Sequence, residues 1–506
     1  MRAGQKTHPL VRASQLVPGG ETEHVTETGA RIAAVASALE RVNLTVEAGS
    51  TPRAQPAHDY QIAARLERLP IARWHTRVRL VVGFAWFFDS FDALAIAYVL
   101  PVLVPLWKLN PVQISSLIAI GYAGQALGSV YFGYTAERRG RIPALLWSVA
   151  LFSVTSLLCA AVWSYTLLLT IRFVQGLGLG GEIPVGHSYM NEIAKASQRG
   201  RFILLYQLSA PLGISASALA GVWIVPNLGW QWMFVLGAVP ALIMLPLIAG
   251  LPESPRWLAS RSQVVEADRV LSKIEAAISD HGLRPLPPIP ERAPAVVAAS
   301  TRFSDLLRGI YLRRTLVVWS IYFCTYLVTY GLTGWLPTIY RTVYHLSVRQ
   351  ALNFSFITTL VSLAGSLAVA LLIDHTGRKP WISAALILGA LPLFVLTGSA
   401  SMSANRVLIL VALGLTGVNT VALAMGMYTA ENYPTHLRSL GGGVAAAWLR
   451  VVAMIGPYVV GFVLPAAGMG AVFSVFGGSA LLGGLICMRF AIETRNRVME
   501  ELAPVV

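Results

Sequence analysis

The chain has 506 residues, of which 55% are hydrophobic and 12% are charged. A soluble globule carries about 25% charged residues, so the composition excludes an ordinary soluble domain. The formal net charge of +15 would suit a nucleic-acid partner. The basic residues gather instead in alternate loops, as membrane orientation requires, and we expect no nucleic-acid binding.

The amino-terminal region is polar and lacks the apolar core of a cleavable signal peptide. Residues 1–59, rich in Thr, Ala and Pro, are predicted to form a disordered cytoplasmic tail, either dispensable or regulatory. Residues 60–77 are amphipathic and basic. We expect this segment to lie on the cytoplasmic surface and to lead into the first membrane span.

From residue 78 onward, apolar runs near 20 residues recur between short polar turns, and such runs are long enough to cross a bilayer. We predict an all-α membrane protein with twelve transmembrane helices in two six-helix bundles, 78–251 and 315–492. A polar cytoplasmic loop, 252–314, joins the bundles and contains a surface helix over Val264–Ile278, and residues 493–506 form a cytoplasmic tail. The predicted spans are Val78–Trp107, Val112–Tyr134, Ile142–Val162, Tyr165–Ile193, Phe202–Val225, Trp230–Leu251, Thr315–Tyr340, Val348–Ile373, Pro380–Ala400, Val407–Tyr433, Leu440–Leu464 and Gly470–Ile492.

The two predicted bundles repeat one another. Glu137 and Asp374 are 237 residues apart, and each precedes a Gly and basic residues. Glu192 and Glu431 are 239 residues apart, and each precedes an Arg by seven residues. Two halves repeated in the same sense imply a pseudo-two-fold axis along the membrane normal, with binding between the halves near the midplane. Lys and Arg concentrate in the loops on one side, which places both termini in the cytoplasm.

Three acidic residues lie well inside predicted spans, away from the span ends: Asp89 and Asp92 in the first and Glu182 in the fourth. A charge at bilayer depth is costly and normally faces a cavity or a partner. Burial and a nearby like charge both favour the protonated carboxyl, so these three residues are the candidates for proton coupling. The alternative for each is an ion pair that only holds helices together.

Arg450 falls in the middle of the eleventh predicted span. A guanidinium stays charged and presents a bidentate fork, so Arg450 is the predicted anchor for a substrate carboxylate, with an ion pair to Glu182 as the alternative. Arg172 either contacts substrate or pairs with Asp89 or Asp92. A stripe of aromatic residues in the seventh span either lines a cavity for a flat ring or only packs. The other substrate-site candidates are Gln175, Tyr326, Tyr330, Trp448 and Asn419.

Acidic and basic side chains recur at the cytoplasmic ends of the predicted spans. Plain orientation charges would explain the arginines but not the repeated acidic residues. We predict inter-helix gate pairs that hold one face closed and break when the halves move. These residues are Glu137, Arg141, Glu192, Arg199, Asp374, Arg378, Glu431 and Arg438.

Several motifs resemble those of the major facilitator superfamily. GYTAERRGR (133–141) resembles its loop motif, with Glu137 where Asp is usual, and RFVQGLGLGGEIP (172–184) resembles its fourth-span motif. PESPRWL (252–258) resembles a signature of the sugar-porter and organic-ion branches. FFDSFDALAIAYVLP (87–101) resembles the first span of aromatic-acid:proton symporters, with Ser90 where Gly is usual. GLGGEIPV (178–185) is similar to the nicotinate-transporter and synaptic-vesicle-protein-like branch.

The resemblance implies a secondary transporter of the inner (plasma) membrane that takes up a small organic acid, an aromatic or heterocyclic carboxylate, with protons by alternating access. The alternatives are a sugar or organic-cation transporter or exporter, and a transporter-like sensor. The chain contains no HExxH, Gly-x-Ser-x-Gly or Walker motif, so we expect neither an enzyme nor a cofactor. Three cysteines share no motif and predict no metal site. The expected partners are the substrate, protons and the bilayer, and the expected state is a monomer.

Overall fold

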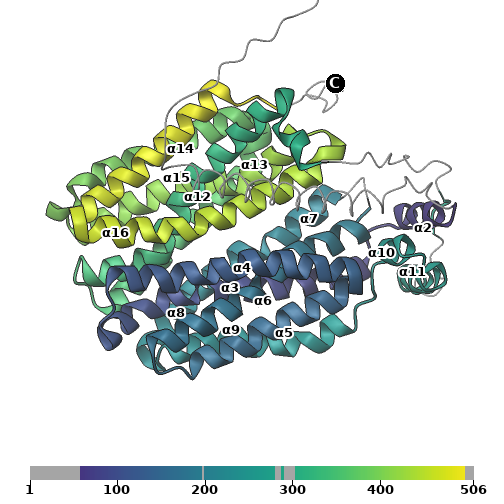
Figure 1. The fold of residues 1–506 in the computed structure, drawn as a ribbon, viewed down its shortest axis with the longest axis horizontal. Coiled ribbons are helices and arrows are strands. Elements are labelled where there is room, and N and C mark those ends of the chain that lie inside the picture. Colours follow the sequence, from purple (N-terminus) through teal and green to yellow (C-terminus); the bar gives the residue numbers. More distant parts are fainter. Residues whose placement is uncertain (1–56, 196–198, 280–285, 290–301, 496–506) are drawn as a thin grey trace, which may run out of the picture. The chain divides into compact units, whose positions relative to one another are not determined.

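The structure of the protein is a computed structural model that describes residues 57–195, 199–279, 286–289 and 302–495. This described part is built from helices and contains no strand (Figure 1). The predicted tails lie largely outside it. Residues 57–59 open helix α2 (Ala57–Arg68), and residues 493–495 end the described chain.

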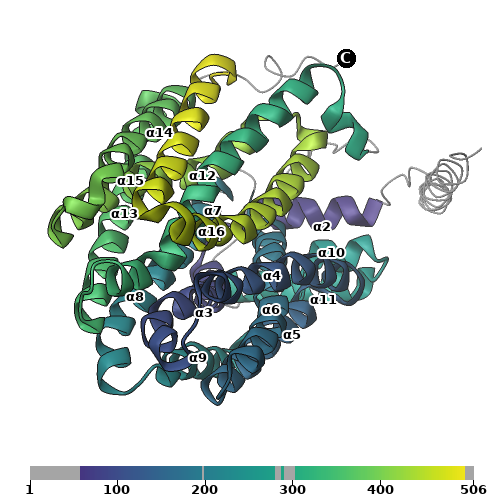
Figure 2. The same cartoon turned by 60° about the vertical axis from the view of Figure 1, so that its left-hand side comes forward.

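The helices follow the predicted spans in order. The first set consists of α3 (Arg73–Trp107), α4 (Pro111–Arg139), α5 (Arg141–Ala160), α6 (Tyr165–Ile193), α7 (Arg199–Gln207) with α8 (Ser209–Asn227), and α9 (Gln231–Ala249). The second set consists of α12 (Gly309–Thr342), α13 (Val348–Thr376), α14 (Arg378–Val395), α15 (Ala404–Asn432) and α16 (Thr435–Phe490). In Figure 2 the two sets form separate bundles, with α12 and α16 of the second bundle next to α3 and α4 of the first.

Nine helical segments of the described chain are long and apolar enough to cross a membrane by length and composition. Helices α4 and α6 are not among the nine, although each has 29 residues. The nine also count α16 once, and its 56 residues bend at Gly468, where φ is +76°. Glycine adopts this backbone conformation at little cost, so Gly468 separates the eleventh and twelfth spans within one continuous element.

Several predicted boundaries are wrong by a few residues. The first helix begins at Arg73, five residues before Val78, because the last five residues of the predicted lead-in continue the spanning helix, whereas residues 60–68 belong to the separate helix α2. The fifth span is divided at Leu208 into α7 and α8. The ninth span leaves α-helical geometry after Val395, and a short 3-10 turn, η3 (Leu396–Ser401), follows it.

Local capping explains several helix starts. Asn110 Oδ1 accepts a hydrogen bond from the Gln113 backbone N–H at 2.8 Å, and Pro111 occupies the first position of α4, where a missing N–H costs nothing. Ser164 and Ser347 cap α6 and α13 in the same way. These caps fix where the chain enters each span.

Helices α4 and α6 pack backbone to backbone through glycines. A Cβ atom added at Gly124 would collide with the Phe173 carbonyl oxygen, and one at Gly128 would collide with the Leu177 carbonyl oxygen. Small residues at such spacing allow two spanning helices to approach closely. This contact places the polar residues of α6 against those of α4.

We expect Gly124→Val to destabilise the protein by about 1–3 kcal/mol or more, because the backbone of α6 must move to admit the side chain. The measurement is thermal unfolding of the purified protein in one detergent. Gly133→Val on the same helix is the matched control, because no atom lies within 4 Å of a Cβ at that position. Equal melting temperatures for the two variants would contradict the close-packing argument.

Three short helices cover one end of the first bundle: α2, α10 (Pro255–Ser260) and α11 (Val264–Ile278). The predicted surface helix over Val264–Ile278 is thereby confirmed. Apolar residues of the three helices, among them Leu66, Leu258 and Leu271, form a small core of their own. Arg65 and Arg68 of α2 each form a 2.6 Å ion pair with Glu275 of α11.

The Glu275 ion pairs predict a pH-dependent contact between α2 and α11. Burial by itself would raise the pKa of Glu275, but the hydrogen bonds from Arg65 and Arg68 outweigh it and lower the pKa below its ordinary 4.5. A carboxyl whose pKa is lowered on folding stabilises the folded state above its unfolded pKa, and this contribution disappears as the pH falls through the folded pKa. We therefore expect α2 to loosen only in acid, as the pH falls below the ordinary pKa of a glutamate.

Spin labels at Gln61 and Ala276, both exposed, can follow this contact. The distance distribution should be narrow at neutral pH and broaden in acid, and Glu275→Gln should broaden it already at neutral pH. Glu266→Gln is the control, since Glu266 forms an exposed pair with Arg269 within α11. A distribution that does not change with pH would refute the prediction.

Candidate functional site

The two bundles are bonded at the end of their helices that lies away from α2, α10 and α11. The Ser115 hydroxyl of α4 donates to the Pro457 carbonyl of α16 at 2.8 Å, and the Ser116 and Tyr458 hydroxyls lie 3.1 Å apart. Arg349 of α13 donates to Asn227 of α8 at 3.2 Å. We call this end the bonded end. The candidate site lies in the middle of the helices, between the bonded end and the end that α2, α10 and α11 cover. In this middle region, polar side chains of both bundles face each other.

Asp92 is held inside the first bundle. It is 0% exposed, and its Oδ1 accepts a 2.6 Å hydrogen bond from the Ser156 hydroxyl of α5. Its Oδ2 accepts a hydrogen bond from the Gln175 side-chain amide of α6. Both carboxylate oxygens therefore have partners from neighbouring helices.

Arg172 joins this network indirectly. Its Nη1 donates to Gln175 Oε1 at 2.7 Å, and its Nη2 donates to the Ala93 carbonyl at 3.5 Å. The predicted pairing of Arg172 with Asp92 is thus formed only through Gln175, and Asp89 is not involved. Arg172 is 2% exposed and Gln175 is 0% exposed, so both lie within the first bundle in this conformation.

Asp89 and Glu182 have a different environment from Asp92. Asp89 is 4% exposed and its Oδ2 has no hydrogen-bond partner, and the same holds for both carboxylate oxygens of the fully buried Glu182. The Tyr206 hydroxyl is a neighbour of Glu182 but is not in hydrogen-bonding geometry with it. Buried polar groups without partners are rare in native structures. Such acids are therefore better placed than Asp92 to gain and lose a proton.

Arg450 reaches from the second bundle to the first. Its guanidinium Nη1 donates to the Gln125 side-chain oxygen of α4, and Asp89 lies within electrostatic range. The alternative ion pair between Arg450 and Glu182 is not formed, because the Glu182 oxygens have no partner. Arg450 is a partly exposed residue, and it is not among the residues that line the cavity described below.

The aromatic stripe of α12 is arranged as a stack. The Tyr326 and Tyr330 rings are 5.9 Å apart with planes 22° from parallel, and Tyr122 of the first bundle packs edge-on against Tyr330 at 4.9 Å. Trp448 is placed elsewhere: it stacks on Trp319 at 5.7 Å and donates to that residue's carbonyl. In the structure Trp448 packs against Trp319 and Phe323 of the second bundle and does not line the cavity described below.

A cavity of about 260 Å³ lies between the bundles beside this stack. Tyr98 and Ser215 line it from the first bundle, and Tyr326, Tyr330 and Asn419 line it from the second. Hydroxyl groups dominate the rest of its polar lining, and no charged side chain of the described residues is part of it. These hydroxyl residues are Thr329, Thr333, Ser355, Thr358, Thr359, Ser362 and Ser366.

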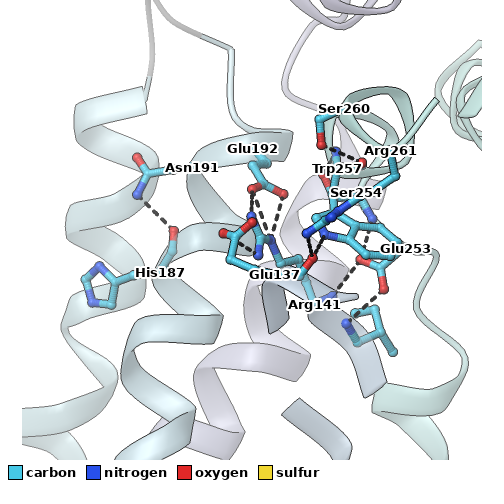
Figure 3. A network of polar contacts seen from close by, with 11 residues as sticks. Glu137, Arg141, His187, Asn191, Glu192, Glu253, Ser254, Trp257, Ser260 and Arg261 are labelled. Carbon is cyan, nitrogen blue, oxygen red and sulfur yellow. Dashed lines mark hydrogen bonds and ion pairs between the residues drawn. The ribbon is translucent and has the colours of Figure 1, made fainter. Parts of the chain in front are cut away.

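The predicted gate residues form ion pairs inside each bundle. Figure 3 shows Arg141 of α5 between Glu137 of α4 and Glu192 of α6, and both salt-bridge distances are 2.8 Å. Arg378 of α14 pairs with Glu431 of α15 at 3.1 Å. These described pairs join helices of one bundle, so they are not contacts between the two halves. The side chains of Arg199 and Asp374 lie outside those described, and Arg438 lies in the first turns of α16.

Two further acids complete these clusters. Glu253 accepts hydrogen bonds from the backbone N–H groups of Arg141 and Ile142 at 3.0 and 3.2 Å, and Glu493 accepts equivalent bonds from Arg378 and Lys379 at 3.1 Å. Each carboxylate therefore caps the start of a spanning helix, where the helix dipole favours negative charge. Burial raises the pKa of Glu253 above its ordinary value.

Sequence reasoning missed Glu253, Glu493, Gln125 and Tyr206. The repeat offered a signal for the first two, because they are 240 residues apart, close to the offsets of the other repeated acids. Gln125 lies among small residues in the second span. The small residues indicate a helix face that packs against another backbone, but they do not indicate which side chain Gln125 contacts.

Comparison with known proteins identifies the family. A family model described as "Sugar (and other) transporter" matches residues 57–505. The chain belongs to this family of the major facilitator superfamily, and it is a multi-pass membrane transporter, not an enzyme. This finding confirms the predicted superfamily and fold class.

Curated relatives cover nearly the whole chain. The niacin transporter NiaP of Acinetobacter baylyi is 31% identical over 447 residues, which cover 87% of this chain and 99% of the relative. The inner membrane metabolite transport protein YdjE of Escherichia coli is 30% identical, with 88% and 99% covered. The putative niacin/nicotinamide transporter NiaP of Bacillus subtilis is 29% identical, with 83% and 96% covered.

Solved structures agree with the fold. A D-xylose–proton symporter has a TM-score of 0.67 at 18% identity, covering 83% of this chain and 99% of its own. The inward-open conformation of the xylose transporter XylE from E. coli has a TM-score of 0.66 at 18% identity, with 85% and 99% covered. At this identity the likeness concerns the fold.

Proposed function

We propose that the protein couples the uptake of an aromatic or heterocyclic carboxylate to protons. The observation that carries the proposal is the position of Arg450: a partly exposed residue in mid-span, bonded to Gln125 of the other bundle and within electrostatic range of the stacked Tyr326 and Tyr330. The guanidinium fork would bind the carboxylate, and the stacked rings would offer a flat apolar surface to the ring of the substrate. The relatives named as niacin transporters suit a substrate of this class.

Asp89 and Glu182 are the proposed proton carriers, with Asp92 as the third candidate. A proton taken up by Asp89 would remove a negative charge near Arg450. The Arg450 guanidinium would then be available to bind the substrate carboxylate. Arg172 and Gln175 would hold Asp92 in place and would reach substrate only after a rearrangement of the first bundle. Asn419 would contribute an uncharged contact from the cavity wall.

Alternating access would require the contacts at the bonded end to break. Ser115–Pro457, Ser116–Tyr458 and Arg349–Asn227 join the bundles there. We assign the opposite end, with α2, α10 and α11, to the cytoplasm, because basic residues of the short loops gather on that side. The Arg141 and Arg378 clusters would then keep each bundle rigid while the two bundles rock, and both termini would lie in the cytoplasm of the inner membrane.

A sugar is the second candidate substrate, and the hydroxyl-rich cavity favours it. Serine and threonine hydroxyls from α12 and α13 line that space with Asn419, and no charged residue of the described chain does. Several of these hydroxyls, such as those of Ser355 and Thr358, donate to carbonyls of their own helix and can still accept a hydrogen bond from a sugar hydroxyl. The unpartnered acids Asp89 and Glu182 would also suit an organic cation, transported in either direction. A transporter-like sensor would bind ligand without accumulating it.

Uptake into proteoliposomes distinguishes these functions. Vesicles with an alkaline interior are supplied with labelled nicotinate, benzoate, xylose or a quaternary ammonium cation, with and without a protonophore. Protonophore-sensitive accumulation of a carboxylate alone supports the proposal. Accumulation of xylose or of the cation but of neither carboxylate would replace it, and binding without accumulation of any substrate would favour the sensor.

A further inference from the structure

A hollow of about 860 Å³ opens on the surface of the first bundle near the start of α3. Helix α3 forms one wall from Arg73 to Phe84, and α9 forms the second wall with Met244 and Leu247. Ile278 at the end of α11 and Leu286 close the hollow from the side of the short helices. The hollow is thus shared by two spanning helices and the surface helices. It is separate from the cavity between the bundles.

Two positive charges lie at the mouth of the hollow. Arg73 and Arg77 are four residues apart on α3, so they share one face of the helix, and both are exposed and line the hollow. Neither guanidinium forms a hydrogen bond or an ion pair with any residue that the structure describes. Arg79, by contrast, lies over the Phe202 ring at 5.3 Å. Among the described residues, no acidic side chain competes with an external anion for these two guanidinium groups.

Apolar side chains line the inner part of the hollow. Leu80 is 53% exposed, Phe84 is 48% exposed and Leu247 of α9 is 45% exposed. Phe84 lies seven residues beyond Arg77, about 10 Å further along the helix and toward the middle of the membrane. Charged groups at the level of the lipid headgroups and an apolar channel at acyl depth match the two parts of a phospholipid.

We propose that this hollow binds an anionic phospholipid, with the phosphate-bearing headgroup between Arg73 and Arg77 and one acyl chain along Leu80, Phe84 and Leu247. Charge complementarity selects the headgroup, because clustered arginines next to a spanning helix attract anionic lipids. The amino-terminal end of α3 adds the positive end of its helix dipole. The lipid would connect α3 and α9 with Ile278 of α11 and so anchor the surface helices to the first bundle.

Native mass spectrometry of the full chain in detergent, titrated with dioleoylphosphatidylglycerol or dioleoylphosphatidylcholine, tests the site. Wild type should retain one phosphatidylglycerol more tightly than phosphatidylcholine. Each arginine near an anionic surface contributes about fivefold, so Arg73→Gln with Arg77→Gln should weaken phosphatidylglycerol binding about 30-fold. Arg73→Lys with Arg77→Lys should retain most of the binding.

The matched control is Arg138→Gln with Arg139→Gln, which removes the same charge from exposed positions of α4 that do not line the hollow. Its phosphatidylglycerol affinity should stay within about twofold of wild type. Melting temperatures in phosphatidylcholine identify a variant that has lost its fold, and the wild-type lipid preference is measured independently of any variant. Equal retention of the two lipids by wild type, equal losses in both glutamine pairs, or full competition by soluble glycerol phosphate would overturn the proposal.

Discussion

Arg450→Lys is expected to lower kcat/KM for uptake of the carboxylate substrate by at least about 30-fold. Lysine keeps the positive charge but replaces a planar fork with a single ammonium, which cannot form two parallel hydrogen bonds to a carboxylate. Weakening one partner of a desolvated, hydrogen-bonded charge pair costs about 2 kcal/mol or more, which corresponds to about 30-fold. Lysine would also lose the bond to Gln125 that holds the guanidinium toward the first bundle.

The measurement is initial-rate uptake over a range of substrate concentrations in proteoliposomes with equal amounts of inserted protein. Arg406→Lys is the control, because Arg406 is an exposed residue near the start of α15, away from the site. Its kcat/KM should match wild type. An Arg450→Lys variant with unchanged apparent affinity for the carboxylate would remove Arg450 from the substrate site, and the sugar-binding alternative would gain support.

Helix number and order could be predicted from the sequence because burial in a membrane leaves a strong local signal. About 20 consecutive apolar residues suffice to identify most spans without knowledge of their neighbours, although α4 and α6 are not among the nine described helices that meet this criterion. The same reasoning predicted the amphipathic helix Val264–Ile278. Helix boundaries are harder to predict, because a helix continues past the apolar run when the flanking residues also favour a helix. Residues 73–77 do so at the start of α3.

Partners of the polar residues could not be predicted in the same way. Helical periodicity tells which residues share a face, but the partner of a side chain depends on the rotation and height of a second helix. Asp89 and Asp92 lie three residues apart, yet Asp92 meets Ser156 and Gln175 while one oxygen of Asp89 meets no donor. Gln125 contacts Arg450, which is 325 residues away in the sequence, and no local sequence pattern predicts this pair.

The gate residues illustrate the same limit. The repeated acids and arginines were recognised as paired, and Arg141–Glu192 and Arg378–Glu431 are such pairs. A repeat relates the two halves but does not tell whether an acid pairs within its own half or with the other. Backbone capping by Glu253 and Glu493 explains why the pairing is internal, because these acids fix the helix start on which each arginine lies.

The second large effect is expected for Asp89→Asn and Glu182→Gln, which should abolish proton-driven accumulation. An amide has the shape of a protonated carboxyl but cannot release a proton. Either variant would therefore hold its site in a state equivalent to the protonated one. With one proton per substrate, a gradient of one pH unit supports about tenfold accumulation in wild type. In the variants the ratio of internal to external substrate should fall to about one, while exchange of labelled for unlabelled substrate continues.

Asp92→Asn is the matched comparison, because it changes the same functional group three residues away on the same helix. Asp92 accepts hydrogen bonds on both oxygens, and an amide can accept on one atom only, so this variant should lose thermal stability yet keep gradient-driven accumulation. If Asp92→Asn abolishes accumulation while Asp89→Asn and Glu182→Gln retain the tenfold ratio, the proton site is the hydrogen-bonded acid. If all three variants accumulate substrate as wild type does, none of these carboxyls carries the coupled proton, and a donor outside the buried acids must replace them.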